Sequence, residues 1–248
     1  MTAPAHERVS KLMTNRGLCS RREADRLIRD GLVRVDGAVV ELGAKAAPDA
    51  RIEIKPSGER RLAAHVTVLL HKPKGIVSTQ PTGDQVAAWT LITLDRFLGN
   101  AHPEAAERAC AKPWTLATAG RLDAASRGLL VLTQDGVLAR RITGGHAVAK
   151  RYRVEVDQPV SDAILAALRG PNALDGEPLL PMEVERLTPR RLRFVLREGR
   201  KHQIRRVCQA HGLEVCDLLR EAIGTWELGD LPEGRWRVVT GSPCVAGG

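Results

Sequence analysis

The sequence predicts an α+β fold, with a small N-terminal domain and a larger, mainly antiparallel sheet domain flanked by helices. Three observations favour this fold class. Short apolar runs of strand length alternate with helix-capping signals along most of the chain. A turn-rich, charged stretch at residues 56–65 separates a basic unit at 7–55 from a longer unit at 66–241, and it is interpreted as a linker. A chain of 248 residues suffices for one large core and a small appended domain.

The charge indicates an anionic partner. Lys and Arg number 38 against 29 acidic residues, which gives a formal net charge of +9. Arginine supplies most of the excess, and its planar fork matches phosphate and stacks on bases. This favours nucleic acid or an anionic surface over ordinary solubility charge in an arginine-rich proteome.

The cysteines predict no disulfide framework and no zinc site. There are five, an odd number without a C-x-x-C pair, namely Cys19, Cys110, Cys208, Cys216 and Cys244. Inert thiols in a reducing cytoplasm are the simple interpretation. The sequence has no apolar signal core and no apolar run of about 18 residues, so we expect a cytoplasmic protein with no membrane partner.

The first unit reads as two helices and a hairpin. Helical spacing runs from Val9 to Arg16, and Gly17 ends that helix. Ser20 and Glu23 form a capping box for a second helix that continues to about Asp30. Strands at 32–35 and 38–40 flank the two-residue turn Asp36-Gly37, and a further strand follows near 51–54.

This unit carries a group of basic residues predicted to bind RNA together with Ser20: Arg8, Lys11, Arg16, Arg21, Arg22 and Arg34. Arg21 and Arg22 stand in the first turn of a helix, where cations oppose the helix dipole, so they are better explained by an external anion. A solvated helix face is the alternative. The segments at 8–12, 20–24 and 33–37 resemble an S4 RNA-binding domain, although Asp36 stands where that family usually has Asn.

The larger unit begins with a strand at 68–70 and the basic turn His71-Lys72-Pro73-Lys74-Gly75. Residues 80–118 are the least readable part. Within them, 91–98 fits either a helix or a strand, and 100–111 is an Ala-rich, helical insertion.

The remaining elements alternate between strands and helices. Strands are expected at 129–133, 150–156, 182–187, 192–196, 215–219 and 236–239. Helices are expected from Gly136 to Ile142, after the capping residue Ser161, and from about His202 to His211. Residues 170–181 form a loop rich in glycine and proline.

Two segments carry candidate chemistry. Gly120-Arg121-Leu122-Asp123 places an acid and an arginine at a bend just before an apolar strand, where a carboxylate is rigidly aimed. Residues 197–208 hold a dense run of cations at the start of a helix, an arrangement suited to phosphate. A surface turn and a solvated helix are the alternatives.

Four motifs follow the S4-like unit in order: residues 71–75, 120–123, 150–152 and 198–206. Together they resemble the RsuA/RluB/RluE/RluF family of ribosomal RNA pseudouridine synthases. The resemblance implies an isomerisation in which the uracil N1–C1′ bond breaks and a C5–C1′ bond forms. This reaction requires no cofactor and no metal, and the sequence has no P-loop or dinucleotide fingerprint.

The resemblance also implies roles for individual residues. Asp123 acts as nucleophile at the sugar or as the base that removes the C2′ proton. Arg205 is the cation paired with Asp123, which keeps a buried carboxylate ionised. Tyr152 stacks on the target base, and Arg121 enters the space that the extruded base leaves. Leu196 either lines the base pocket or belongs to the core.

Other motif residues are predicted to contact the substrate: Lys72, His202, Gln203 and Arg206. Arg206 is expected at a phosphate or on the helix surface.

The expected function is pseudouridylation of ribosomal RNA by a monomer that acts on ribosomal subunit precursors, with transfer RNA as a further substrate. The motifs at 174–178 and 200–206 favour large-subunit RNA. The alternative is a non-catalytic RNA-binding protein for ribosome assembly.

Overall fold

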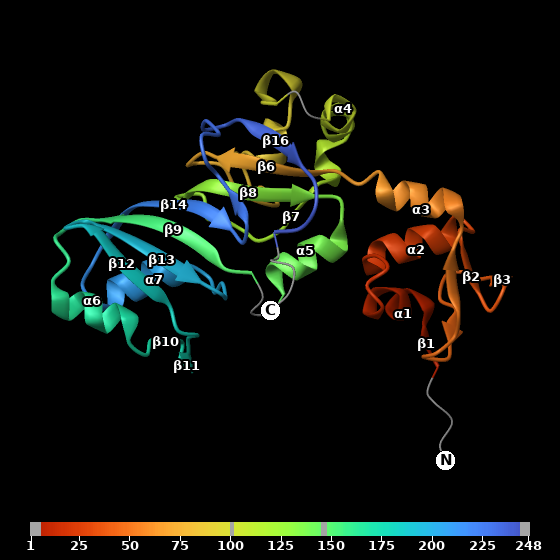
Figure 1. The fold of residues 1–248 in the computed structure, drawn as a ribbon, viewed down its shortest axis with the longest axis horizontal. Helices are drawn as coiled ribbons and strands as arrows, with labels where there is room; N and C mark the ends of the chain where they lie inside the picture. The colour runs from red at the N-terminus through yellow and green to blue at the C-terminus, as the bar shows by residue number, and fades with distance from the viewer. Residues whose placement is uncertain (1–5, 100–101, 145–147, 244–248) are drawn as a thin grey trace, which may run out of the picture.

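The computed structural model describes residues 6–99, 102–144 and 148–243 (Figure 1). Most of the predicted N-terminal tail, the first two residues of the Ala-rich insertion (Asn100 and Ala101) and Cys244 lie outside the described ranges. The predicted α+β class is confirmed, with a small unit at the N-terminus and a larger unit around one sheet.

The small unit contains two helices, α1 (Val9–Asn15) and α2 (Arg21–Arg29), beside short strands. Strands β2 (Val33–Val35), β3 (Ala38–Val39) and β5 (Ile52–Ile54) form a sheet in the order β3-β2-β5, while β1 (Glu7–Arg8) pairs with β4 (Lys45–Ala46).

Local signals in the small unit behave as predicted. The Ser20 side chain accepts from the Glu23 N–H, and the Glu23 carboxylate accepts from the Ser20 N–H, so the capping box is confirmed. Asp36 and Gly37 both have positive φ, 48° and 85°, as a two-residue hairpin turn requires. The apolar face of α2 packs on the strands and gives this unit its own core.

The predicted turn-rich linker is wrong in conformation, because helix α3 (Pro56–Ala63) occupies it. Pro56 is favourable at the first helical position. Gly58 is one of the residues that make the stretch look turn-rich. In the structure it is buried, and a Cβ there would lie 2.7 Å from the Ile54 side chain. Leu62 packs on the core of the small unit. The glycine therefore serves close packing of a helix rather than a bend.

The larger unit is built on a sheet whose main path runs β12-β13-β9-β14-β8-β6-β16. These strands are β6 (Thr67–Lys72), β8 (Arg127–Thr133), β9 (Lys150–Val156), β12 (Glu183–Thr188), β13 (Arg191–Leu196), β14 (Val215–Ile223) and β16 (Trp236–Val239). Short strands β7 (Ala117–Thr118) and β15 (Trp226–Glu227) pair with β8 and β14. Among the described strand pairs only β8–β14 is parallel, which confirms a mainly antiparallel sheet.

Helices pack against the sheet around three separate cores (Figure 1). Helices α6 (Asp162–Arg169) and α7 (Gln203–Ala210) pack with β9, β12 and β13 around one core. Helix α5 (Gly136–Thr143) packs with β8 and β14 in a second core, and α4 (Pro103–Ala111) belongs to a third with β6 and Trp236. The two-residue strands β10 (Ala173–Leu174) and β11 (Glu177–Pro178) form a small hairpin within the predicted loop at 170–181.

The segment at 91–98 is neither the helix nor the strand left open by the sequence. It lies within a run of short 3₁₀ turns, η1 (Ala88–Leu91) and η2 (Leu94–Arg96), with η3 (Pro113–Thr115) further on. The Phe97 ring lies 4.8 Å from that of Trp236, so tertiary packing orders this segment instead of periodic secondary structure.

The two units touch where α5 begins. A Cβ on Gly136 would lie 2.3 Å from the Ser20 Cβ, so only glycine fits between this helix and the start of α2. His65 Nε2 also lies 3.0 Å from the Glu23 carboxylate. Helix α5 then continues to Ile142 and Thr143, which line a cavity of the larger unit.

Candidate active site

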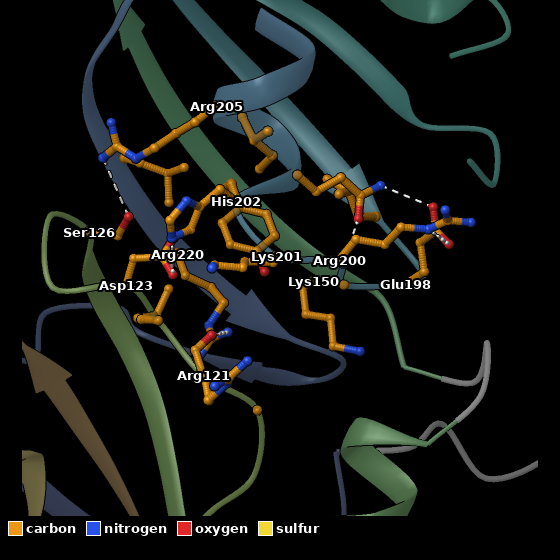
Figure 2. Close-up of a pocket in the computed structure, with 18 of the residues that line it drawn as sticks. Arg121, Asp123, Ser126, Lys150, Glu198, Arg200, Lys201, His202, Arg205 and Arg220 are labelled. Atoms are coloured by element: carbon orange, nitrogen blue, oxygen red, sulfur yellow. Dashed lines mark hydrogen bonds and ion pairs between the residues drawn. The ribbon is translucent and has the colours of Figure 1, made fainter. Parts of the chain in front are cut away.

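An open cavity of about 430 Å³ lies between the loop before β8 and the start of α7. Its walls include Asp123, Tyr152, Leu196, His202 and Arg205, which come from segments far apart in the chain (Figure 2). The volume is within the range of small-molecule pockets. The fold therefore brings the predicted catalytic residues to one cavity.

The loop that carries Asp123 is held by an unbroken series of hydrogen bonds. Five consecutive carbonyl oxygens, at residues 121–125, each accept one bond. Their donors, in chain order, are Arg220 Nη1 (3.2 Å), Ser78 Oγ (2.6 Å), Ser126 N (3.0 Å), Gly75 N (2.8 Å) and Arg205 Nη2 (3.1 Å). Gly120, with φ of 86°, makes the bend that starts the loop. Such a loop presents a preorganised side chain.

The Asp123 carboxylate faces the cavity and is 40% exposed. Among the described contacts, the His202 imidazole lies beside this carboxylate, with Nε2 3.3 Å from Asp123 Oδ1. His202 has a φ of 54°, a left-handed conformation that is costly for a residue with a Cβ. The backbone strain at His202 coincides with its contact to the catalytic candidate.

The expected ion pair between Asp123 and Arg205 is absent among the described contacts, and this corrects the sequence-based expectation. Arg205 Nη1 donates to the Val215 carbonyl (2.9 Å), and Nη2 donates to the Ala125 carbonyl and to Ser126 Oγ (3.4 Å; Figure 2). The guanidinium is thus committed to the backbone on both sides of the cavity. Arg205 supports the loop, and through it the position of Asp123.

The RNA-binding candidates of the small unit are placed on its surface. Arg8, Lys11, Arg16, Arg21, Arg22 and Arg34 are all exposed. Lys11 pairs with Glu7 and Arg16 donates to the Pro48 carbonyl, whereas Ser20 is used as the cap of α2. Ser20 therefore contributes by shaping the helix start next to Arg21 and Arg22.

Comparison with known families agrees with this arrangement. Residues 66–210 match the family described as RNA pseudouridylate synthase, and residues 7–52 match the S4 domain. The chain belongs to the RNA pseudouridylate synthase family. It is an RNA pseudouridine synthase, an isomerase, with an N-terminal S4 RNA-binding domain.

Curated relatives and a solved structure align with nearly the whole synthase. It is 30% identical to the dual-specificity RNA pseudouridine synthase RluF of Escherichia coli K12, over 96% of this chain and 77% of the relative. It is 31% identical to ribosomal small subunit pseudouridine synthase A of Yersinia pestis, over 94% of each chain. A crystal structure of a pseudouridylate synthase, 27% identical, superposes with a TM-score of 0.63 over 94% of this chain and 96% of the other.

Within the synthase, Lys72 is placed differently from the substrate contact that was expected. Its side chain is fully buried, and Nζ donates to the carbonyls of Pro73 (2.7 Å) and Ile76 (2.8 Å). Burial lowers the pKa of Lys72 to about 8, and the nearby Asp123 charge partly offsets this effect. Lys72 therefore holds the backbone at the end of β6 and is not exposed to a substrate.

Gln203 and Arg206 also depart from the predicted substrate contacts. Gln203 lines the cavity but is buried, since it donates to Glu198 (3.0 Å) and accepts from the Arg200 N–H (2.9 Å). This clamp shapes the turn before α7. Arg206 lies outside the cavity and pairs with Asp175 (2.6 Å), which corresponds to the helix-surface alternative.

Tyr152, Leu196 and Arg121 are brought together by the fold, and their roles remain predictions. All three line the cavity. Tyr152 is half-buried and packs against the core below β9, Leu196 is buried, and Arg121 is exposed at the cavity rim. Leu196 therefore belongs both to the core and to the cavity wall.

Sequence reasoning missed three residues of the site: Ser78, Lys150 and Arg220. Lys150 stands in the quoted motif at 150–152 without an assigned role, and its pKa is lowered by burial and by the charge of Arg220. Arg220 is 2% exposed. Its strand also carries Asp217 and Glu221, so no local signal in the sequence distinguishes Arg220.

The described residues contain no His, Cys, Asp or Glu cluster able to hold a metal ion. The four described cysteines, all but Cys244, are free. Helices in the described ranges are too short or too polar to cross a bilayer.

Proposed function

We propose that this synthase converts a specific uridine of ribosomal RNA to pseudouridine, with Asp123 as the catalytic carboxylate. The observation that carries the proposal is the Asp123 loop, whose five successive carbonyls are all hydrogen-bonded while the carboxylate faces a cavity of about 430 Å³. A carboxylate fixed in this manner is suited to attack the sugar or to remove its C2′ proton.

The proposed reaction moves no electrons to or from an acceptor. The N1–C1′ bond breaks, the uracil turns within the cavity, and the C5–C1′ bond forms. The C5 proton is then lost and N1 gains a proton. Asp123 takes part either as the group bonded transiently to the sugar or as the C2′ base. Tyr152 offers a flat face for the detached uracil.

The substrate uridine must leave its base stack to reach Asp123, which costs a few kcal/mol. Arg121 lies at the cavity rim, next to Asp123 in the same loop, and we assign it to the space vacated in the RNA. Contacts between the S4 domain and the phosphates contribute binding energy that offsets this cost.

The charge distribution supports an RNA that approaches from the cavity side. Six cations and two carboxylates line the cavity. On the opposite face of β9, Arg151 lies 2.8 Å from Glu227, and Arg153 lies 3.5 Å from Glu221. Charges are paired on that face, whereas cations outnumber carboxylates in the cavity.

Ribosomal RNA is proposed because the Yersinia relative is named for the small ribosomal subunit, while an Arabidopsis thaliana relative, 32% identical over 90% of this chain, is named a putative large-subunit synthase. The large-subunit preference and the use of transfer RNA remain predictions. We also propose that the synthase acts as a monomer on ribosomal subunit precursors.

Chemical mapping of pseudouridine tests this proposal. Ribosomal RNA from a deletion strain is incubated with wild type or with Asp123→Asn. We expect one or a few uridines to be modified by wild type only. Equal amounts of pseudouridine from both proteins would show that Asp123 is not catalytic. If wild type forms no pseudouridine in the RNA of either ribosomal subunit, ribosomal RNA is not the substrate.

The alternative, a non-catalytic assembly protein, predicts that Asp123→Asn restores the ribosome profile of the deletion strain. The presence of Asp123, Tyr152 and Arg205 around one cavity favours catalysis.

A further inference from the structure

Two buried cations on the cavity wall lack an anionic partner in the described part of the chain. Lys150, at the start of β9, is 8% exposed and lines the cavity, and its Nζ has no hydrogen-bond or ion-pair partner among the described residues. Arg220 is 2% exposed; Nε and Nη1 donate to the Leu129 (2.8 Å) and Arg121 carbonyls, but Nη2 is buried without a partner. Figure 2 shows both side chains with Arg121 on one side of the cavity, away from Glu198.

The two charges are close enough to affect one another. The charge on Arg220 adds to burial in lowering the pKa of Lys150. Two like charges that line the same cavity repel one another, and an anion bound between them relieves this repulsion. An unpaired buried donor such as Arg220 Nη2 carries a further desolvation cost.

The carboxylates that line the cavity do not compensate this pair. Asp123 contacts His202. Glu198 accepts from the Leu180 N–H (2.9 Å) and from Gln203, and lies 3.7 Å from Arg200. The cation pair therefore requires an anion from outside the protein.

We propose that Lys150 and Arg220 form an anion subsite, which binds the phosphate of the target nucleotide inside the catalytic cavity. This inference rests on the proposed function, because the target nucleotide is its ligand. Uracil is neutral and leaves the two charges uncompensated, whereas a phosphate carries a full negative charge and accepts bonds from both an ammonium and a guanidinium.

The geometry of β9 connects this subsite with the base. Lys150 and Tyr152 are two residues apart on one strand, so their side chains lie on the same face, about 7 Å apart along the strand. One nucleotide spans that distance with its base on Tyr152 and its phosphate at Lys150. The subsite then fixes the ribose between them, opposite Asp123.

This arrangement has an unusual consequence for stability. Because Lys150 lacks a partner in the empty protein, Lys150→Met, which preserves length and removes the charge, is expected to raise the melting temperature. A lysine that stabilised the fold would have the opposite effect. The same substitution is expected to weaken binding of phosphate-bearing ligands.

The experiment compares binding of uridine and uridine 5′-monophosphate to the full chain by NMR titration. For wild type we expect at least tenfold tighter binding of the monophosphate. For Lys150→Met we expect this preference to fall below threefold while uridine affinity is retained. Lys112→Met, an exposed lysine outside the cavity, is the matched control and should retain the preference.

Three outcomes would overturn the subsite: no measurable binding of the monophosphate to wild type, equal affinity of wild type for both ligands, or an undiminished preference in Lys150→Met. A lower melting temperature of Lys150→Met would also contradict it. Pseudouridine mapping is a separate measurement. A monophosphate preference without any pseudouridine would refute the proposed function but not the subsite, and the reverse result would refute the subsite only.

Discussion

The hydroxyl of Ser78 bonds twice to one residue: it donates to the Leu122 carbonyl at 2.6 Å and accepts from the Leu122 N–H at 2.8 Å. Ser78 is buried, and Leu122 immediately precedes Asp123. A single side chain thus satisfies both backbone groups of the residue that precedes Asp123, the proposed catalytic carboxylate.

Replacing Ser78 with alanine leaves both Leu122 backbone groups buried without a partner. We expect a loss of about 1–3 kcal/mol in the free energy of unfolding and, because the Asp123 loop loosens, a fall in kcat of roughly tenfold with KM little changed. Denaturant unfolding and steady-state pseudouridine formation measure the two effects. Ser57→Ala, on exposed helix surface, is the control, and an unchanged kcat in Ser78→Ala would show that the loop is held without this hydroxyl.

His202 allows backbone strain and side-chain chemistry to be separated. Glycine adopts a φ of 54° at little cost, so His202→Gly should be more stable than His202→Ala by about 1 kcal/mol. Both variants lose the imidazole that contacts Asp123, and both should lose activity to the same extent. Thermal unfolding and turnover of the two variants check this. Equal stabilities would mean that the left-handed backbone carries no strain.

Arg205 is expected to act on Asp123 through the loop. Arg205→Lys retains the charge but cannot bridge the carbonyls of Val215 and Ala125 with one planar group. We expect kcat to fall about tenfold or more, and the loss to be strongly non-additive with Asp123→Asn in a double-mutant cycle. Additive losses would show that the two residues act independently.

Lys72 makes stability depend on pH in the alkaline range. Its pKa is lowered to about 8 in the folded protein and is higher in the unfolded chain, so unfolding takes up a proton between these values. Stability contributed through Lys72 therefore rises as pH increases above about 8, by at most about 1.4 kcal/mol per pH unit. The difference in unfolding free energy between wild type and Lys72→Met, measured at pH 7 and pH 9.5, should move in favour of wild type. A constant difference would exclude this titration.

Local signals in the sequence predicted most of the elements. Capping at Ser20 and Ser161 marked two helices, and the Asp36-Gly37 turn marked a hairpin. These signals act within a few residues, so the local structure that they specify does not depend on tertiary contacts. Gly58 misled because its role depends on Ile54, a neighbour in space whose side chain leaves no room for a Cβ.

Some site residues were predicted and others were not, because their roles also depend on neighbours in space. The motifs identified Asp123, Tyr152 and Arg205, which line one cavity. Sequence order did not reveal that Lys72 is buried or that the Arg205 guanidinium is used by backbone carbonyls. The role of Arg220 depends on a loop 99 residues away, which no local pattern encodes.

The parallel pair β8–β14 has a mechanical consequence. It joins the two halves of the sheet through two register positions, Leu219 with Arg127 and Arg220 with Gly128. Asp123 comes from the half beside β8, whereas Tyr152 and His202 come from the half that contains β9 and α7. Side chains reinforce this short seam, because one core includes Leu129 from β8 and Leu219 from β14. The position of Asp123 relative to Tyr152 and His202 therefore depends on side-chain packing across the seam as well as on two strand pairings.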